Sequence, residues 1–220
     1  MQNRSGPPRA VISLLAATAV GATLLLGPGG ASAQGRTQKL SKAMLERAQD
    51  TQKAIQQTEK QLDKVTDRYG RLIGGKDQKA RRKEHKKVAD ELGKLEKRAK
   101  DVRKRSQAME REASKYFKEW GKSIDGIKDN ELRSLSRQRL TESQQGYGRT
   151  VAAGREAADQ YDTFVSMLGN QLKYLEVDLS DPAVAKLKSS NQDLRGEAKE
   201  LRSRIAKLKS EIDSHLKGLK

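Results

Sequence analysis

Residues 44–72 read MLERAQDTQKAIQQTEKQLDKVTDRYGRL, in which apolar or small side chains recur at alternating steps of four and three residues. This is the heptad spacing by which helices pack against one another along a shared seam. The stretch therefore predicts one long helix with a single buried side. Its seam consists of Met44, Ala48, Thr51, Ile55, Thr58, Leu62, Val65, Tyr69 and Leu72.

The same spacing recurs in three further stretches, and short breaks separate them. The breaks fall at residues 74–75 (two glycines), at 126–130 and at Asp181-Pro182, where the aspartate would cap a helix and the proline would occupy its first position. We therefore expect helices at roughly 37–73, 78–126, 131–176 and 182–217. No stretch alternates between apolar and polar residues, so we predict no strand and an all-α fold.

Short connections place successive helices antiparallel, and sustained heptads favour shallow crossing angles. We predict an elongated antiparallel four-helix bundle made of coiled-coil hairpins, whose second helix would be about 70 Å long. Alternatively, the two hairpins open and pair with a second chain to form a homo-oligomer. The heptad pattern is compatible with both arrangements.

Two seams contain polar or small residues. In the fourth stretch Asn191 occupies a seam position, where a buried asparagine more often fixes the register of helices than binds a ligand. In the third stretch, the predicted seam consists of Leu140, Gln144, Tyr147, Val151, Gly154, Ala158, Tyr161, Val165, Leu168, Leu172 and Leu175.

The two middle helices are predicted to be longer than the outer two by about ten residues, so their shared turn would project roughly 15 Å beyond the bundle. Phe117, Trp120, Ile124 and Ile127 lie near this tip. They either seal the end of a two-helix hairpin or form a docking tip for a partner or a membrane, because exposed aromatic clusters often mark binding sites.

The N-terminus has the features of a secretory signal peptide. Arg4 and Arg9 precede an apolar run at residues 10–26, and a small-residue cleavage pattern ends at Ala33. We expect residues 1–33 to be removed and residues 34–220 to form a single elongated helical domain, exported to the periplasm or the exterior. The alternative is that the apolar run is retained as an N-terminal membrane anchor.

The composition argues against an enzyme. Only 34% of the 220 residues are hydrophobic, there is no cysteine, and His85 and His215 are the two histidines. The sequence contains no phosphate-binding glycine loop, no paired-histidine metal motif and no nucleophile elbow. We therefore expect no catalytic residues, no metal and no cofactor.

The net charge of +17 is unevenly distributed. Residues 76–105 contain 14 Lys and Arg against six Asp and Glu, whereas residues 106–181 contain 11 against 13. This basic segment is either a solvated helix face or a surface for anionic lipid or another polyanion. It has no interleaved aromatic residues for base stacking, so we expect no sequence-specific nucleic-acid binding. The candidate anion contacts are Lys79, Arg82, Lys83, Lys86, Lys87, Lys94, Lys97, Arg98 and Lys104.

Several stretches resemble a bacterial family of exported coiled-coil proteins known as domain-of-unknown-function family 2959. They are YFKEW at 116–120, NELRSLS at 130–136, QLKYLEVDL at 171–179 and AVAKLK at 183–188. The resemblance implies long helices and a periplasmic location, and it transfers no catalytic residue. The family's members resemble lipoproteins, but this chain lacks the cysteine that would carry a lipid, so the resemblance does not imply membrane tethering.

These observations favour a non-enzymatic exported rod that acts as a scaffold or interaction partner in the bacterial cell envelope, with an unidentified protein or envelope partner. An alternative is a salt-sensitive binder of anionic membrane or envelope polyanion through residues 76–105. A third hypothesis is a helical dimer that bends membranes.

Overall fold

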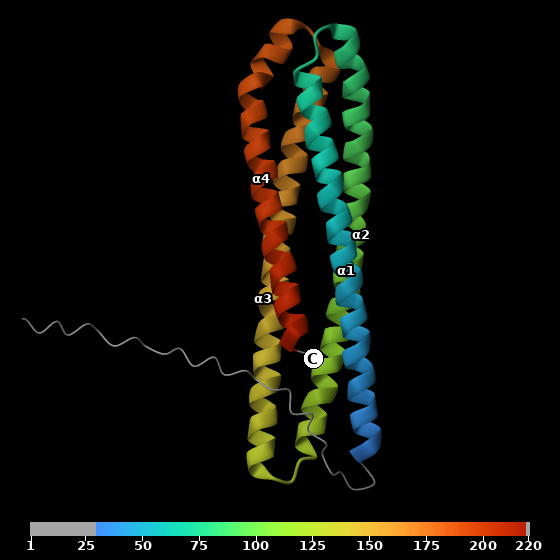
Figure 1. The fold of residues 1–220 in the computed structure, drawn as a ribbon, viewed down its shortest axis with the longest axis vertical. Helices are drawn as coiled ribbons and strands as arrows, with labels where there is room; N and C mark the ends of the chain where they lie inside the picture. Colours follow the sequence, from blue (N-terminus) through green and yellow to red (C-terminus); the bar gives the residue numbers. More distant parts are fainter. Residues whose placement is uncertain (1–29, 219–220) are drawn as a thin grey trace, which may run out of the picture.

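A computed structural model describes residues 30–218 of the chain (Figure 1). Four helices follow one another: α1 (Gly30–Ile73), α2 (Gln78–Asp125), α3 (Asn130–Val177) and α4 (Asp181–Gly218). Residues 30–218 contain no strand, so the all-α prediction is confirmed. Most of the predicted signal peptide, residues 1–29, lies outside the described part, and its cleavage after Ala33 stays a prediction.

The helices form one elongated antiparallel bundle (Figure 1). α1 packs most extensively on α2, and α3 on α4, which gives two hairpins. Contacts between α1 and α4 and between α2 and α3 join the hairpins, so a single chain closes the bundle. With 48 residues each, α2 and α3 are about 72 Å long. The predicted four-helix bundle is therefore confirmed.

The core follows the predicted seams closely in α1 and α4. All nine predicted seam residues of α1 are buried, from Met44 to Leu72. In α4 the seam from Leu194 to Ile212 is buried without interruption, and His215 continues it. Such a thin core needs few apolar residues, which explains how a chain with 34% hydrophobic residues folds into a rod.

The predicted seam of α3 is wrong in its N-terminal half. Its buried positions are Gly146, Thr150, Ala153 and Ala157, which precede predicted positions by one residue. A shift of one residue rotates a helix face by about 100°. The two series meet at Tyr161, beyond which Phe164 and Leu168 are fully buried. Between residues 153 and 158 both series consist of Gly or Ala, so hydrophobicity there did not distinguish them.

The predicted projecting hairpin tip is also wrong. α1 begins at Gly30 rather than near residue 37, and it accompanies α2 almost to the end of α2. The Thr37 hydroxyl lies 3.3 Å from the Ser123 hydroxyl, and Arg36 pairs with Glu119 at 3.9 Å. Only α4 stops short, so this end of the bundle contains three helices rather than two (Figure 1).

The opposite end is fixed by Arg81, a cation within the basic segment that is 8% exposed. Its guanidinium donates to the carbonyls of Gly75 (2.9 Å) and Leu179 (3.2 Å) and pairs with Asp181 at 2.5 Å. It therefore connects the α1–α2 turn with the α3–α4 turn. Position 75 must lack a side chain, because a Cβ there would lie 2.8 Å from Cγ of Arg81.

The cap of α4 differs from the prediction by one residue. The Ser180 hydroxyl, not the Asp181 carboxylate, accepts from a backbone N–H of the first turn, that of Ala183 at 3.4 Å. Asp181 is instead the first helical residue, and its carboxylate binds Arg81. Asp77 caps α2 by accepting from the Ala80 N–H at 2.7 Å.

Candidate functional site

The nine predicted anion contacts lie along the first half of α2. Seven of them are exposed, and Lys87 and Arg98 are half-buried. The buried residues of the same segment, such as Val88, Leu92 and Leu95, lie on the opposite side of the helix. The heptad seam thus directs the cations outward, away from the other three helices.

Three of the nine cations have partners within the protein. Lys87 binds Glu84 at 2.6 Å, Lys94 binds Glu91 at 3.0 Å, and Arg98 donates to Gln57 at 2.8 Å. Within the described residues, no ion pair engages the other six. At about 100° per residue, the six project within an arc of roughly 100° around the helix axis, so they share one side of α2. They are Lys79, Arg82, Lys83, Lys86, Lys97 and Lys104.

The acidic residues of the segment explain why so many cations are unpaired. Glu84 and Glu91 point toward α1, where Arg68 lies 3.6 and 3.8 Å from their carboxylates. The hydrogen bond from Lys87 lowers the pKa of Glu84, and the hydrogen bond from Gln61 lowers the pKa of Glu91. Both carboxylates are therefore engaged on the inner side of the helix and do not neutralise its outer side.

The row of cations without an ion pair among the described residues contains three further members, of which Arg111 and Lys118 lie beyond the predicted segment. Lys100, Arg111 and Lys118 are exposed and continue it at the same helical spacing. Arg111 and Lys118 lie outside residues 76–105, whose net charge predicts the basic segment, and Lys100 lies inside it but is not among the nine predicted contacts. We call the complete row the basic face; it comprises Lys79, Arg82, Lys83, Lys86, Lys97, Lys100, Lys104, Arg111 and Lys118.

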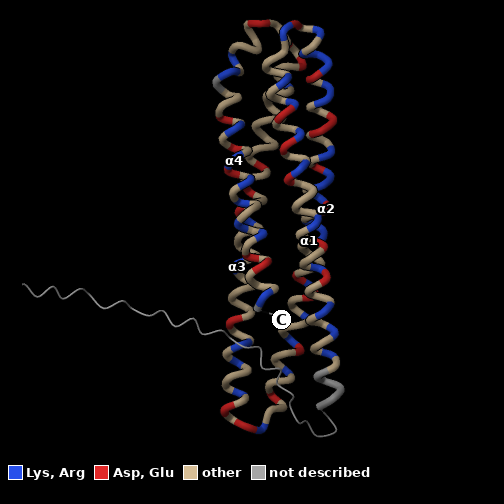
Figure 2. The backbone as a smooth tube through the Cα atoms, in the orientation of Figure 1, with Lys and Arg blue, Asp and Glu red and all other residues tan. Residues whose placement is uncertain are grey.

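The basic face extends over 40 residues, from Lys79 to Lys118, or about 58 Å of the rod. Figure 2 shows the blue positions recurring along α2 from the Arg81 end toward the α2–α3 turn. Asp90 is an exposed acid on the same side, between Lys86 and Lys97. Like charges three and four residues apart repel one another by about 0.2–0.5 kcal/mol per pair, and an anionic partner would relieve this repulsion.

The four residues of the predicted docking tip occupy different environments. Ile124 is only 1% exposed, so it belongs to the packing of the bundle end. Phe117 and Trp120 are half-buried in a cluster around Tyr116, and the Trp120 indole lies 3.4 Å from the Ser136 hydroxyl. Ile127 is half-buried in the α2–α3 turn. The large apolar side chains exposed at this end belong to α3 instead: Leu132 and Leu135, each 47% exposed.

Asn191 is half-buried on α4, and its Oδ1 is buried without a hydrogen-bond partner among the described residues. Next to Asn191, hydrogen bonds between helices are made by Gln171 of α3. Its side chain accepts from the Tyr69 hydroxyl and donates to the Ser190 carbonyl at 3.3 Å. Gln171 therefore connects α1, α3 and α4. The register role of Asn191 stays a prediction.

Two further properties bear on function. Within residues 30–218, no group of three His, Asp or Glu side chains is placed to hold a metal ion. None of α1 to α4 has a stretch both long and apolar enough to cross a bilayer.

A comparison with protein families gives a match that covers nearly all of the four-helix bundle. The family model named "Protein of unknown function (DUF2959)" matches residues 35–219. The chain belongs to the DUF2959 family. The match includes the whole basic face and all four helices except the first residues of α1, so the bundle is the DUF2959 domain of this chain. No curated protein and no solved structure matched the DUF2959 chain.

Proposed function

We propose that this DUF2959 protein is a non-enzymatic rod, exported to the bacterial cell envelope, that adheres to an anionic surface through the basic face. The observation that carries the proposal is the row of nine exposed cations along α2 that form no ion pair with any residue the structure describes. A solvated helix face that serves only solubility usually mixes both signs of charge. Here Glu84 and Glu91 are directed toward α1 and Asp101 is paired with Arg105, so few acids of the segment lie among the cations.

The shape of the bundle supports the same proposal. A straight face of about 58 Å would contact many lipid headgroups or polymer charges at once. Each contact is weak, at about 1 kcal/mol per cation near an anionic membrane, but the contacts add along the row. Lysine and arginine side chains at the surface need no pocket for this purpose, so the binding would be tolerant of headgroup identity and sensitive to salt.

The test is cosedimentation of the purified protein with phosphatidylglycerol vesicles and with phosphatidylcholine vesicles across a salt series. We expect binding to the anionic vesicles at low salt, a steep loss as salt rises, and little binding to the neutral vesicles. Retention on an immobilised polyphosphate resin in the same salt series would show whether a free polyanion substitutes for the lipid surface.

Two variants with equal charge change locate the binding surface. The first replaces Lys83, Lys86, Lys97 and Lys104 of the basic face by Gln. The matched control replaces four lysines that form ion pairs on the same helix, Lys87, Lys94, Lys115 and Lys122. We expect the first variant to lose most vesicle binding and the control to lose much less. Equal loss in both variants, or no binding of the unmodified protein at low salt, would contradict the proposal.

A further inference from the structure

The middle of the bundle contains a cavity of about 390 Å³ between all four helices. Its walls are mostly apolar and include Ile55 of α1, Val102 of α2, Ala157 of α3 and Ile205 of α4. Ligand pockets of proteins commonly have 300–1,000 Å³ and often lie between the helices of bundles. The cavity spans α2 from Ala99 to Glu110, which corresponds to a length of about 17 Å.

The cavity arises where the seams of α2 and α3 carry small side chains. Ala99 and Ser106 of α2 face Gly154 and Ala158 of α3, so the two helices enclose space that larger residues would fill. On one side of this region Phe164 and Leu168 close the core, and on the other the aromatic cluster of Tyr116 does so. Empty apolar space in a core lowers stability. A larger side chain that filled this cavity would therefore stabilise the fold, and the chain has small residues there instead.

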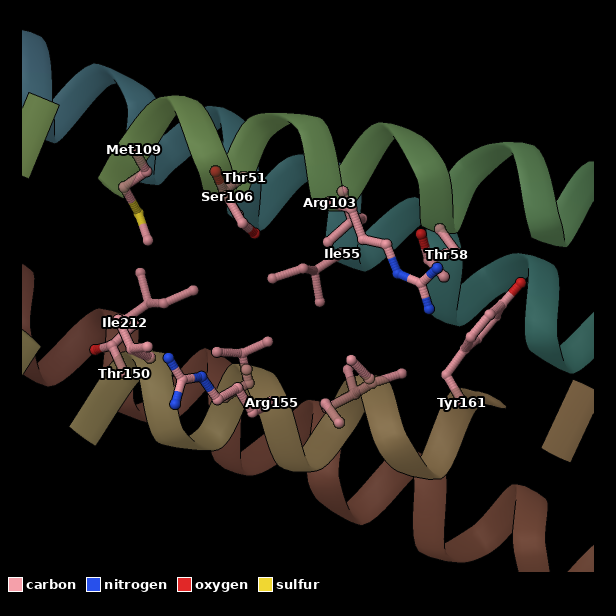
Figure 3. Close-up of a pocket in the computed structure, with 18 of the residues that line it drawn as sticks. Thr51, Ile55, Thr58, Arg103, Ser106, Met109, Thr150, Arg155, Tyr161 and Ile212 are labelled. Atoms are coloured by element: carbon pink, nitrogen blue, oxygen red, sulfur yellow. The ribbon is translucent and has the colours of Figure 1, made fainter. Parts of the chain in front are cut away.

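Two arginines reach the cavity on the side between α2 and α3. Figure 3 shows Arg103 of α2 and Arg155 of α3 on opposite walls of the cavity, with Arg103 extending toward Tyr161 and Arg155 extending toward Thr150. Arg103 pairs with Asp162 at 2.6 Å and lies 5.7 Å from the centre of the Tyr161 ring. No ion pair engages Arg155 within the described residues. Glu110 is the acid in the cavity wall; it follows Met109 on α2 and lies close enough to Tyr147 to affect its hydroxyl.

The hydroxyl groups of two tyrosines in the cavity wall also lack a hydrogen-bond partner among the described residues. Tyr161 is 9% exposed, and its hydroxyl is buried without a hydrogen-bond partner among the described residues. The hydroxyl of Tyr147, in the same wall, is also buried and unpartnered. Buried polar atoms without partners are uncommon in native proteins and are often completed by a bound molecule.

From these observations we propose that the cavity binds a single-chain amphiphile with an anionic headgroup, such as a fatty acid. The acyl chain lies along the apolar space between the four helices, and the headgroup lies at the α2–α3 side against Arg155. The elongated shape favours a chain over a ring system, and the free guanidinium favours a carboxylate over an alcohol. This site is separate from the basic face and does not depend on it.

The first test measures binding of dodecanoate to the full chain by titration calorimetry, below the micelle concentration. We expect one saturable site per chain. Because burial of one methylene contributes about 0.8 kcal/mol, affinity should fall about fourfold for each methylene removed between dodecanoate and octanoate. Dodecanol should bind at least tenfold more weakly than dodecanoate.

Variants separate the cavity from non-specific adsorption. Ser106→Leu and Ala158→Leu each fill the cavity and should abolish dodecanoate binding, with retained helical circular dichroism. At least one of them should raise the melting temperature. Arg155→Gln should weaken dodecanoate binding tenfold or more and leave dodecanol binding unchanged. Arg139→Gln, an exposed arginine of the same helix outside the cavity, is the matched control and should bind like the unmodified protein.

Three results would overturn the proposal: no saturable one-site binding, equal binding by the folded cavity-filling variants, or equal dodecanoate binding by the Arg155 and Arg139 variants. The variant with Lys83, Lys86, Lys97 and Lys104 replaced should keep the one-site binding. If the four-lysine variant lost dodecanoate binding while the cavity-filling and Arg155 variants kept it, the fatty acid would be bound at the basic face and not in the cavity.

Discussion

At the scale of single residues, a histidine at a seam position, His215, makes the stability of the bundle depend on pH. The imidazole is buried near the end of α4, where its ring lies 5.6 Å from the Tyr147 ring. Burial, and to a smaller extent the charge of Arg149, lowers the pKa of His215 below 6.5. Gly146 permits this packing, because a Cβ there would lie 3.3 Å from Nδ1 of His215.

The lowered pKa of His215 predicts a loss of stability in mild acid. The unfolded state binds the proton of this imidazole more readily than the folded state does. The contribution of His215 to the free energy of unfolding is therefore fully present above pH 6.5, and it is lost as the pH falls from 6.5 toward the lowered pKa. One such site contributes a slope of at most about 1.4 kcal/mol per pH unit. Urea unfolding between about pH 5 and 7.5 should show this slope, and His215→Leu should remove it. A slope that persists unchanged in the variant would contradict the prediction.

Arg81 predicts a second effect at this scale. Arg81→Ala leaves the carbonyls of Gly75 and Leu179 and the carboxylate of Asp181 without their shared donor. We expect a loss of about 3 kcal/mol, which corresponds to about 10 °C in melting temperature for a chain of this length. The matched control is Arg82→Ala, because the neighbouring side chain is exposed and has no ion pair in the described part of the chain. Thermal melts should show little change for this control.

At the scale of the helices, α3 is the least uniform element. Residues 131–145 contain no buried residue, because α4 ends before reaching them, whereas buried residues recur regularly from Gly146 onward. Its first part is anchored at the turn by Arg133, which donates to the Ile127 carbonyl at 2.8 Å. The heptad pattern indicated the helix correctly, but it did not indicate which part of the helix would be covered.

This difference predicts a gradient of local stability along α3. Segments with few buried contacts open at low free energy, so their amides exchange faster with solvent. In hydrogen–deuterium exchange, residues 131–145 should exchange well before residues 153–175. The facing part of α2, residues 111–125, should be better protected, because Met44 of α1 packs with Ala113 and Tyr116, and Ile124 is buried. Uniform protection along α3 would contradict this prediction.

At the scale of the whole molecule, the sequence predicted the number, order and approximate bounds of the helices. Heptads and turn residues are local signals, which is why these features could be recognised. The rotation of α3, the position of Arg81 between two turns and the central cavity depend on contacts between residues far apart in the chain. For the basic face, the sequence did contain the signal, since Lys100, Arg111 and Lys118 repeat at helical spacing with the predicted cations.

The position of Arg81 also determines how the bundle could open. Residues 126–129 form the covalent link between the two hairpins, and the bonds of Arg81 lie at the opposite end of the rod. Separation of the hairpins would therefore begin with release of Arg81 and pivot about residues 126–129. Two chains opened in this way could exchange hairpins, and the exchanged dimer would repeat every interface of the closed bundle. By holding the distal turns together, Arg81 raises the barrier to that exchange, although the same bonds would form again in the exchanged dimer.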